Sequence, residues 1–237
     1  MRDQAGYTLI ETMVVIVLLT IVMGFVTETI IQTQRAYTRS SIRLTDTGDL
    51  RVALDTMTKT IRTAIRLSSA TTAFLPAQVM VNGAPANNVI RGRQVVENGV
   101  ECWFYANLES NPAPQLAHYY VDANRQLIEE LTHADAGSVG PNWTYTGAPY
   151  RHRVIAHNVV VPTASGTPIF TYYDQGGTVL NVAGNVTAPV PDASLGGIGD
   201  VQIRLSVSSG PASVSTITTL VNRVRLVNAD LPANTGS

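Results

Sequence analysis

The sequence is poor in cysteine, in lysine and in charge. Its 237 residues include one cysteine, Cys102, and one lysine, Lys59, and only 14% of them are Asp, Glu, Lys or Arg, for a formal net charge of -1. A single cysteine excludes an intramolecular disulfide, and the balanced charge gives no bulk signal for nucleic-acid binding. Cys102 shares a strand face with Val100 and Phe104, so we expect a small buried side chain there.

Patterns that carry catalysis or metal binding are also missing. The four histidines are His118, His133, His152 and His157. Their spacing does not fit a zinc site. The chain has no Gly-rich phosphate loop between a strand and a helix, and no Gly-x-Ser-x-Gly elbow. We therefore expect a protein that is not an enzyme and that has no cofactor and no metal site.

The N-terminal segment lacks both proline and charge over long stretches. Proline is absent from Tyr7 to Leu75, and charge is absent from Thr12 to Thr27. The apolar run from Tyr7 to Ile31 would span roughly 38 Å as a helix, enough to cross a bilayer core of about 30 Å. We therefore expect a transmembrane helix over about residues 9–31. A carboxylate at the head of such a segment is costly in lipid, so Glu11 is a candidate functional residue.

A cleaved signal peptide or a plain signal anchor would account for less of this segment. A secretory signal peptide needs a small-x-small cleavage site after the apolar run, and residues 23–28 are a poor match. A plain signal anchor fits the run but leaves Glu11 without a role. The charges give a conflicting signal, because Arg35, Arg39 and Arg43 follow the run. By the positive-inside rule alone, the domain after them would lie inside the cell.

The residues Gly6-Tyr7-Thr8-Leu9-Ile10-Glu11 and the apolar run after them resemble the class III signal of type IV prepilins and type II secretion pseudopilins. The resemblance implies that a prepilin peptidase cuts between Gly6 and Tyr7 and methylates the new amine of Tyr7. It also implies that the helix stays in the cytoplasmic membrane with the C-terminal domain outside, against the charge rule. In these filaments, the glutamate that matches Glu11 pairs with the N-terminal amine of a neighbouring subunit.

Two positions depart from the family pattern. Tyr7 replaces the commoner phenylalanine, which is a mild change. Glu28 stands where major pilins often carry proline, so we expect a more continuous helix. The partners that the resemblance implies are the prepilin peptidase, other pilins or pseudopilins through the N-terminal helix, an inner-membrane assembly platform and membrane lipid. Nucleic acid stays a minority alternative.

A second apolar pattern continues the helix beyond the membrane. The residues that recur at spacings of 4, 3, 4 and 4 are Leu50, Leu54, Met57, Ile61 and Ile65. This spacing is typical of an amphipathic helix with one apolar stripe. The charged residues placed off the stripe are Asp46, Asp49, Arg51, Asp55, Lys59 and Arg62. We expect one helix over residues 7–67, amphipathic over about 42–67, with Thr45–Asp49 as the point where it could kink.

From Ser68 onward, Pro, Gly and Asn separate short β-rich runs. The candidate strands are Gln78–Val81, Gln94–Val96, Val100–Ala106, Gln115–Val121, Gln126–Leu131, Val154–Val161, Ile169–Tyr173, Val201–Val207 and Thr216–Leu226. Asp122–Asn124 predicts a hairpin turn, and apolar residues alternate with polar ones from Val201 to Val207, which predicts an antiparallel sheet with one buried face. The predicted fold class is α+β and pilin-like. It consists of a leader at 1–6, a long helix that is transmembrane in its first half, and an antiparallel β-sheet domain at 68–237 packed on the second half.

The C-terminal half carries a second resemblance. The run Phe170-Thr171-Tyr172-Tyr173-Asp174, the glycines Gly176-Gly177 and the alternating run to Val207 are similar to J-type minor pseudopilins and W-type minor pilins. Independently of that likeness, Asp174 with the two glycines predicts a tight turn, and Phe170 and Tyr172 share one face. Some members of the family bind calcium in a loop, and the residues that could contribute here are Asp174, Asp192 and Asp200.

The leading hypothesis is a minor type IV pilin that primes or caps a filament. A minor pseudopilin of a type II secretion system is the first alternative, and a single-pass anchored domain of another kind is also open. A DNA-uptake or adhesive pilin is a further alternative. It would use Arg91 and Arg93 or Arg151 and Arg153 for phosphate contacts. We expect these arginines to be solvated surface residues.

Overall fold

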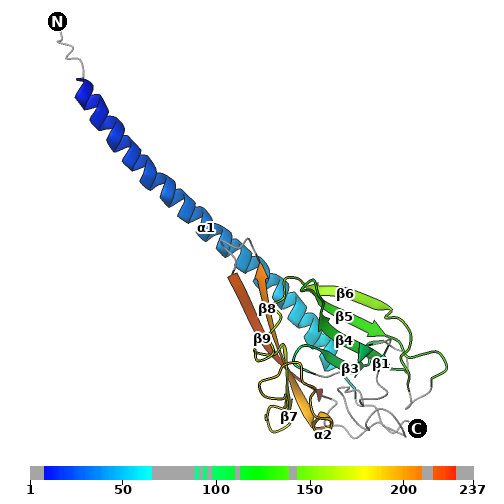
Figure 1. Ribbon diagram of the computed structural model, residues 1–237. Helices are drawn as coiled ribbons and strands as arrows, with labels where there is room; N and C mark the ends of the chain where they lie inside the picture. Colours follow the sequence, from blue (N-terminus) through cyan, green and yellow to red (C-terminus); the bar gives the residue numbers. More distant parts are fainter. Residues whose placement is uncertain are drawn as a thin grey trace. The chain divides into compact units, whose positions relative to one another are not determined.

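The computed structural model describes residues 8–65, 89–90, 93–94, 98–109, 113–138, 143–209 and 216–227. The chain divides into two compact units, Met1–Thr45 with Gly210–Thr216 and Asp46–Ser209 with Ile217–Ser237. Figure 1 shows the long helix α1 and the strands of the second unit. The predicted strand Gln78–Val81 lies outside the described residues, as do the last two residues of Gln94–Val96.

The N-terminal helix is one continuous element, α1, from Leu9 to Arg62. It is helical throughout Thr45–Asp49, where a kink could have occurred. The helix ends at Arg62 instead of the predicted Leu67 because the chain joins a sheet. Ala64 forms an antiparallel bridge with Ala106, and the Ile65 amide donates to the Tyr105 carbonyl at 2.8 Å.

The first unit contains the apolar part of α1. Its large side chains are exposed, for example Leu9 at 78% and Phe25 at 73%. The hydroxyls of Thr20 and Thr27 each donate to the carbonyl four residues earlier, at 2.8 Å. Hydroxyls bonded in this way add little cost in lipid. Among the described residues, α1 is the one helix that is long and apolar enough to cross a membrane.

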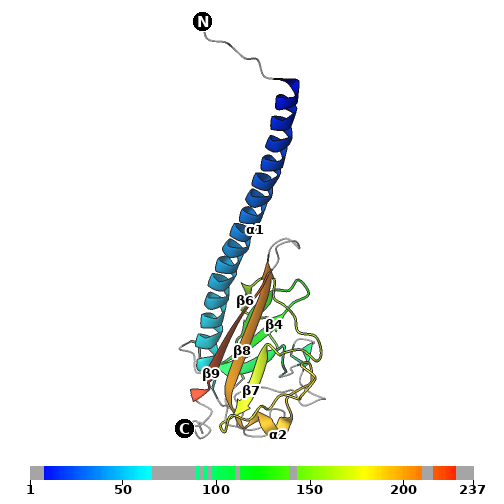
Figure 2. The ribbon, with the colours of Figure 1, turned by 90° about the vertical axis from the view of Figure 1, so that its left-hand side faces the viewer.

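Two sheets form most of the second unit. The first sheet has the order β3-β4-β5-β6 and comprises β3 (Cys102–Ala106), β4 (Gln115–Val121), β5 (Leu127–Thr132) and β6 (Arg151–Ala156). The second has the order β7-β8-β9 and comprises β7 (Phe170–Asp174), β8 (Ile198–Ser209) and β9 (Thr216–Arg225), which lie side by side in Figure 2. The remaining elements are the paired β1 (Val89–Ile90) and β2 (Arg93–Gln94), and the single turn α2 (Asp192–Leu195). A long helix followed by antiparallel sheets confirms the predicted α+β fold class.

One predicted strand, Val154–Val161, is displaced in the structure. β6 begins earlier, at Arg151, and ends at Ala156, shortly before Asn158 adopts a φ of 54°. Val159 then forms an antiparallel bridge with Val207, and the Val160 amide donates to the Ser206 carbonyl at 2.8 Å. The predicted run therefore contributes to both sheets, which a single strand assignment does not capture.

Both predicted turns are confirmed. The hairpin after β4 is closed by Asp122, whose Oδ1 accepts the amides of Asn124 at 3.0 Å and Gln126 at 2.7 Å. After β7, Gly177 has a φ of 86°, a conformation that favours glycine. Its amide donates to the Asp174 carbonyl at 3.1 Å, which closes the tight turn.

The apolar stripe of α1 lies in the main core of the second unit. Leu50, Met57 and Ile61 are each 0% exposed. Core residues from both sheets accompany them, including Phe104, Tyr119, Phe170, Tyr172, Val201, Ile203, Leu205 and the predicted inward-facing Cys102. Asp46 was placed off the stripe but is buried, because it precedes Leu50 by four residues and shares its face.

Truncating the stripe should destabilise the second unit. We expect Leu50→Ala to lower the free energy of unfolding by about 2–5 kcal/mol, because it removes buried methyl groups and leaves a cavity. Val52 lies on the same helix but is 68% exposed. Val52→Ala should change the free energy by less than about 0.5 kcal/mol. Guanidinium unfolding of the detergent-solubilised protein, followed by near-UV circular dichroism, measures both, and equal losses would contradict the packing.

Candidate functional site: the head of the N-terminal helix

Glu11 and Thr8 form a capping box at the start of α1. The Thr8 amide donates to Glu11 Oε2 at 2.8 Å, and the Thr8 hydroxyl donates to the same oxygen at 3.0 Å. The Glu11 amide donates to Thr8 Oγ1 at 3.4 Å. The pattern satisfies amides that the first helical turn leaves without intrahelical partners. The other two candidate residues, Gly6 and Tyr7, lie outside the described residues.

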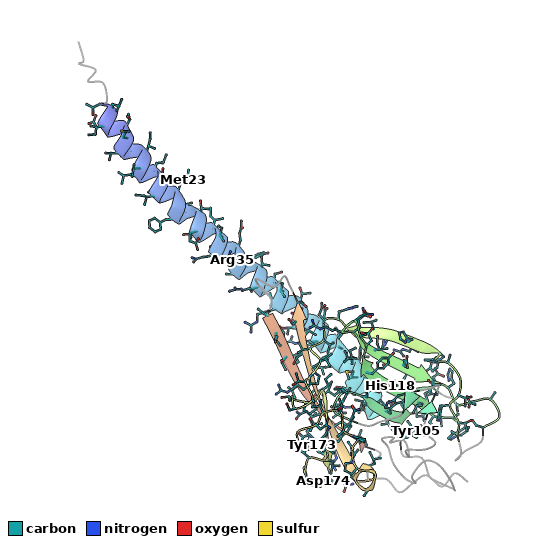
Figure 3. All side chains as sticks on the ribbon, viewed as in Figure 1. Met23, Arg35, Tyr105, His118, Tyr173 and Asp174 are labelled. Atoms are coloured by element: carbon teal, nitrogen blue, oxygen red, sulfur yellow. The ribbon has the colours of Figure 1, made fainter. Side chains whose placement is uncertain are left out.

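The capping box engages only one oxygen of the Glu11 carboxylate. Within the described part of the chain, Oε1 has no hydrogen-bond partner, and its neighbours are exposed apolar side chains such as Ile10 at 70% and Val14 at 53%. Figure 3 shows side chains projecting from both edges of the apolar part of α1, around the labelled Met23. A carboxylate oxygen in such surroundings can accept a hydrogen bond from a second molecule or form an ion pair with a cation of that molecule.

Glu28, the second carboxylate of the apolar segment, has a local partner. The Gln32 side-chain amide donates to Glu28 Oε1 at 2.8 Å, one helical turn away. α1 continues through Glu28 without a break, as expected from the absence of proline. Glu28 therefore provides a natural comparison for Glu11 on the same helix.

Comparison with known proteins identifies the N-terminal segment. Residues 1–27 match the family model described as the prokaryotic N-terminal methylation motif. The comparison with curated proteins gave no match, and neither did the comparison with solved structures. The matched segment contains Gly6, Tyr7 and Glu11 together with most of the apolar run.

The motif and the fold together point to the class of type IV pilin-like proteins. This class is structural, and its N-terminal motif implies processing by prepilin peptidase and assembly with other pilins. The exposed apolar part of α1 agrees with a single-pass membrane anchor. The match ends within α1, so it supports the class but does not distinguish between subtypes of pilin and pseudopilin.

The second unit contains a buried carboxylate whose partners come from the two neighbouring strands, β4 and β6. Glu129 of β5 is 0% exposed. It accepts the Tyr119 hydroxyl at 2.6 Å, and its Oε2 lies 2.6 Å from Arg153 Nε and 3.1 Å from Arg151 Nε. Burial and the adjacent Glu129 raise the pKa of Tyr119, which keeps its hydroxyl a donor. The side chains of Arg151 and Arg153 are 42% and 38% exposed, in keeping with the expected surface position, and both also pair with Glu129, which weakens the case for phosphate contacts.

A second polar row crosses the other face of the same sheet. His118 is 1% exposed and stacks on Trp103, with ring centroids 3.5 Å apart. Its Nε2 lies 3.1 Å from Glu101 Oε2, and its Nδ1 lies 3.6 Å from Glu130 Oε2. The interaction of Glu130 with His118, together with contacts from His152 and Tyr120, outweighs the effect of burial and lowers the pKa of the Glu130 carboxyl to about 2.

Strand register explains both rows. Trp103 pairs with His118, His118 with Glu130 and Glu130 with His152. On the opposite face, Tyr119 pairs with Glu129 and Glu129 with Arg153. Neither row was expected from the sequence. The predicted hairpin at Asp122–Asn124 was the available signal for the β4–β5 pairs.

The residues considered for calcium are engaged elsewhere or not described. Asp174 Oδ1 accepts the Thr178 amide at 2.7 Å, and Asp200 Oδ2 lies 2.7 Å from an Arg223 nitrogen. The side chain of Asp192 is outside the described set. In the part of the chain that the structure describes, no group of three or more His, Cys, Asp or Glu residues is arranged to hold a metal ion.

The Glu130 contacts should make stability depend on acid pH. A carboxyl whose pKa is lowered by folding contributes stability above its unfolded pKa and loses it as the pH falls toward the folded value. We expect the wild-type free energy of unfolding to fall by about 2 kcal/mol more than that of Glu130→Gln between about pH 5 and about pH 3. Chemical denaturation at each pH tests this, with Glu109→Gln at an exposed site as control. Parallel pH profiles for wild type and Glu130→Gln would contradict the prediction.

Proposed function

We propose that the protein is a minor type IV pilin, a structural subunit that primes or caps a type IV pilus or a pilus-like filament. The observation that carries this proposal is Glu11. It is a carboxylate with one open oxygen at the head of an exposed apolar helix, within a segment that matches the methylation motif. The long helix followed by antiparallel sheets supports the proposal.

In this proposal, cleavage prepares the N-terminus for assembly. Prepilin peptidase cuts between Gly6 and Tyr7 and methylates the new amine of Tyr7. The apolar part of α1 is retained as a single-pass anchor in the cytoplasmic membrane, with the C-terminal domain outside. An inner-membrane platform then transfers the subunit to a cell-surface pilus or to a periplasmic pseudopilus.

Glu11 then supplies the contact between subunits. The Thr8 cap uses Oε2, so Oε1 can accept the charged Tyr7 amine of a neighbouring subunit without breaking the cap. In the apolar surroundings of bundled helices, an unpaired carboxylate costs several kcal/mol, and a pair with the amine offsets that cost. Because the charged groups must meet, the pair also sets the axial register of adjacent helices.

The minor role rests on the likeness of the C-terminal half to J-type pseudopilins and W-type pilins. The residues that carry it form the β7 turn and the alternating strand β8. A minor pseudopilin of a type II secretion system shares these features and is the alternative. Deletion of the gene separates the two, because loss of pili indicates a pilin and loss of protein secretion indicates a pseudopilin.

Neutralising Glu11 should block assembly without blocking insertion. We expect Glu11→Gln protein to be processed and inserted in the membrane, but reduced at least about tenfold in sheared filaments, because a neutral amide loses the pair with the amine. Glu28→Gln is the matched control and should assemble, because Glu28 lies at the opposite end of the apolar run from the Tyr7 amine. Immunoblots of the membrane and filament fractions measure both, and normal filament content of Glu11→Gln would exclude the proposed role.

The processing step has a direct test. N-terminal sequencing or mass spectrometry of the mature protein should show methylated Tyr7 as the first residue. Gly6→Leu should abolish cleavage, because the residue before the cut must be small in the proposed peptidase site. Retention of Met1 in the mature wild-type protein, or a cut after Ile31, would refute the pilin proposal.

A further inference from the structure

Three arginines follow the membrane segment at a spacing of one helical turn. Arg35, Arg39 and Arg43 lie on α1 and are exposed, and no acidic residue occurs between Glu28 and Asp46. A spacing of four places them on one face of the helix. No ion pair of Arg35 or Arg39 occurs among the described residues. By the positive-inside rule their charge opposes the proposed orientation, so they call for another role.

The end of the apolar run sets the depth of these side chains. Ile31 is its last residue, and Arg35 and Arg39 follow roughly 6 Å and 12 Å further along the helix axis. The interfacial layer on each side of the hydrocarbon core is about 5–8 Å thick. Side chains on a helix lean toward its N-terminus, so arginines placed after the span reach back toward the lipid. Both guanidinium groups therefore come within reach of the headgroup layer.

An aromatic residue marks the same depth. Tyr37 lies between the two arginines in sequence and is 77% exposed. Tyrosines are enriched at membrane interfaces because the ring is apolar and the hydroxyl is polar. The hydroxyls of Thr33 and Thr38 donate to carbonyls of their own helix at 2.8 Å and 2.9 Å, so they are not available to a lipid phosphate. The arginines are the charged donors of this segment.

We propose that Arg35 and Arg39 bind the phosphate of an anionic phospholipid headgroup, with Tyr37 at the same depth on the opposite face of the helix. Guanidinium groups match phosphate through paired hydrogen bonds, and basic residues next to a span are attracted to anionic lipid. The contact holds one end of the membrane segment at the headgroups. Glu11 lies roughly 36 Å before Arg35 along the helix, close to the thickness of the bilayer, so the contact also keeps Glu11 near the opposite interface. The inference rests on the proposed membrane anchoring and does not depend on filament type.

Lipid retention in the full chain tests this proposal. Detergent-solubilised protein is titrated with phosphatidylglycerol or with phosphatidylcholine, and native mass spectrometry reports the dissociation constants. We expect the wild-type protein to prefer phosphatidylglycerol. Each arginine should contribute about fivefold, so the double variant Arg35→Gln/Arg39→Gln should bind phosphatidylglycerol about 25-fold more weakly with little change for phosphatidylcholine. Added salt should reduce the wild-type preference.

The matched control carries the same change of charge on the same helix. Arg51 and Arg62 are exposed residues of α1 in the second unit. Arg51→Gln/Arg62→Gln should keep the wild-type preference, and an equal loss in this control would overturn the proposal by showing an effect of net charge. Unchanged phosphatidylglycerol affinity in Arg35→Gln/Arg39→Gln would also overturn it. If that variant instead kept lipid affinity but failed to assemble, the arginines would belong to a contact with an acidic neighbour.

A parallel measurement separates this inference from the proposed function. Protein reconstituted in vesicles is washed with carbonate at high pH. Failure of the wild-type protein to stay with the vesicles would reject membrane anchoring, and the lipid site with it. Retention without a preference for phosphatidylglycerol would reject the lipid site alone, and the pilin proposal would stand.

Discussion

The cost of removing a carboxylate from water bears on both units of this chain. Glu129 is completely buried, and its partners belong to its own fold: Oε1 accepts hydrogen bonds from the Tyr119 hydroxyl and an Arg153 nitrogen, and Oε2 forms ion pairs with Arg151 and Arg153. Glu11 has an apolar setting as well, but only one of its oxygens has local donors. A buried carboxylate whose charge is compensated by cations of its own fold needs no other molecule, whereas a carboxylate without a cation nearby needs one from another molecule when water is excluded. This difference separates a structural carboxylate from one suited to assembly.

Helix α1 meets two different demands along its length. Its first part is apolar on all sides, which suits lipid or a bundle of helices but not water. Its later part buries a single stripe, including Leu50 and Met57, in the core of the second unit. The absence of proline allows both parts to belong to one helix. The hydroxyls of Thr20 and Thr27 in the apolar part donate to carbonyls of their own helix, so they need no partner from lipid.

Periodicity made the helix and most of the strands predictable. The spacing of apolar residues located α1, the alternation from Val201 to Val207 located the buried face of β8, and Asp122–Asn124 located a hairpin. The end of α1 was not predictable, since Ala64 and Ile65 leave the helix to pair with Ala106 and Tyr105, which come from a distant part of the sequence. β6 was displaced for the same reason, because Val159 pairs with the other sheet.

The candidate site shows the same division between local and distant information. Glu11 stood out as an isolated charge, and its Thr8 partner was present in the sequence three residues earlier. The register of β4 and β5 followed from their hairpin, so the pairing of His118 with Glu130 could have been predicted. The partners Trp103 and Arg153 could not, because long connections separate their strands from that hairpin. Local spacing therefore identifies the proposed assembly residue, whereas the buried polar rows need the structure.

The capping box suggests why cleavage and assembly are coupled in the proposed mechanism. Before cleavage, Tyr7 has an amide in place of an amine, so the N-terminal end of the helix offers Glu11 no cation. In the single subunit, Thr8 already donates two hydrogen bonds to Oε2. These bonds reduce the free-energy cost of placing the Glu11 carboxylate of the uncleaved protein in the membrane. Cleavage adds a positive charge one residue before the cap. In an apolar bundle, an ion pair between this amine and the Glu11 Oε1 of a neighbouring subunit is more stable than in water, because attraction between charges strengthens as water is excluded. The cap therefore holds the carboxylate ready, and the new amine supplies the missing partner.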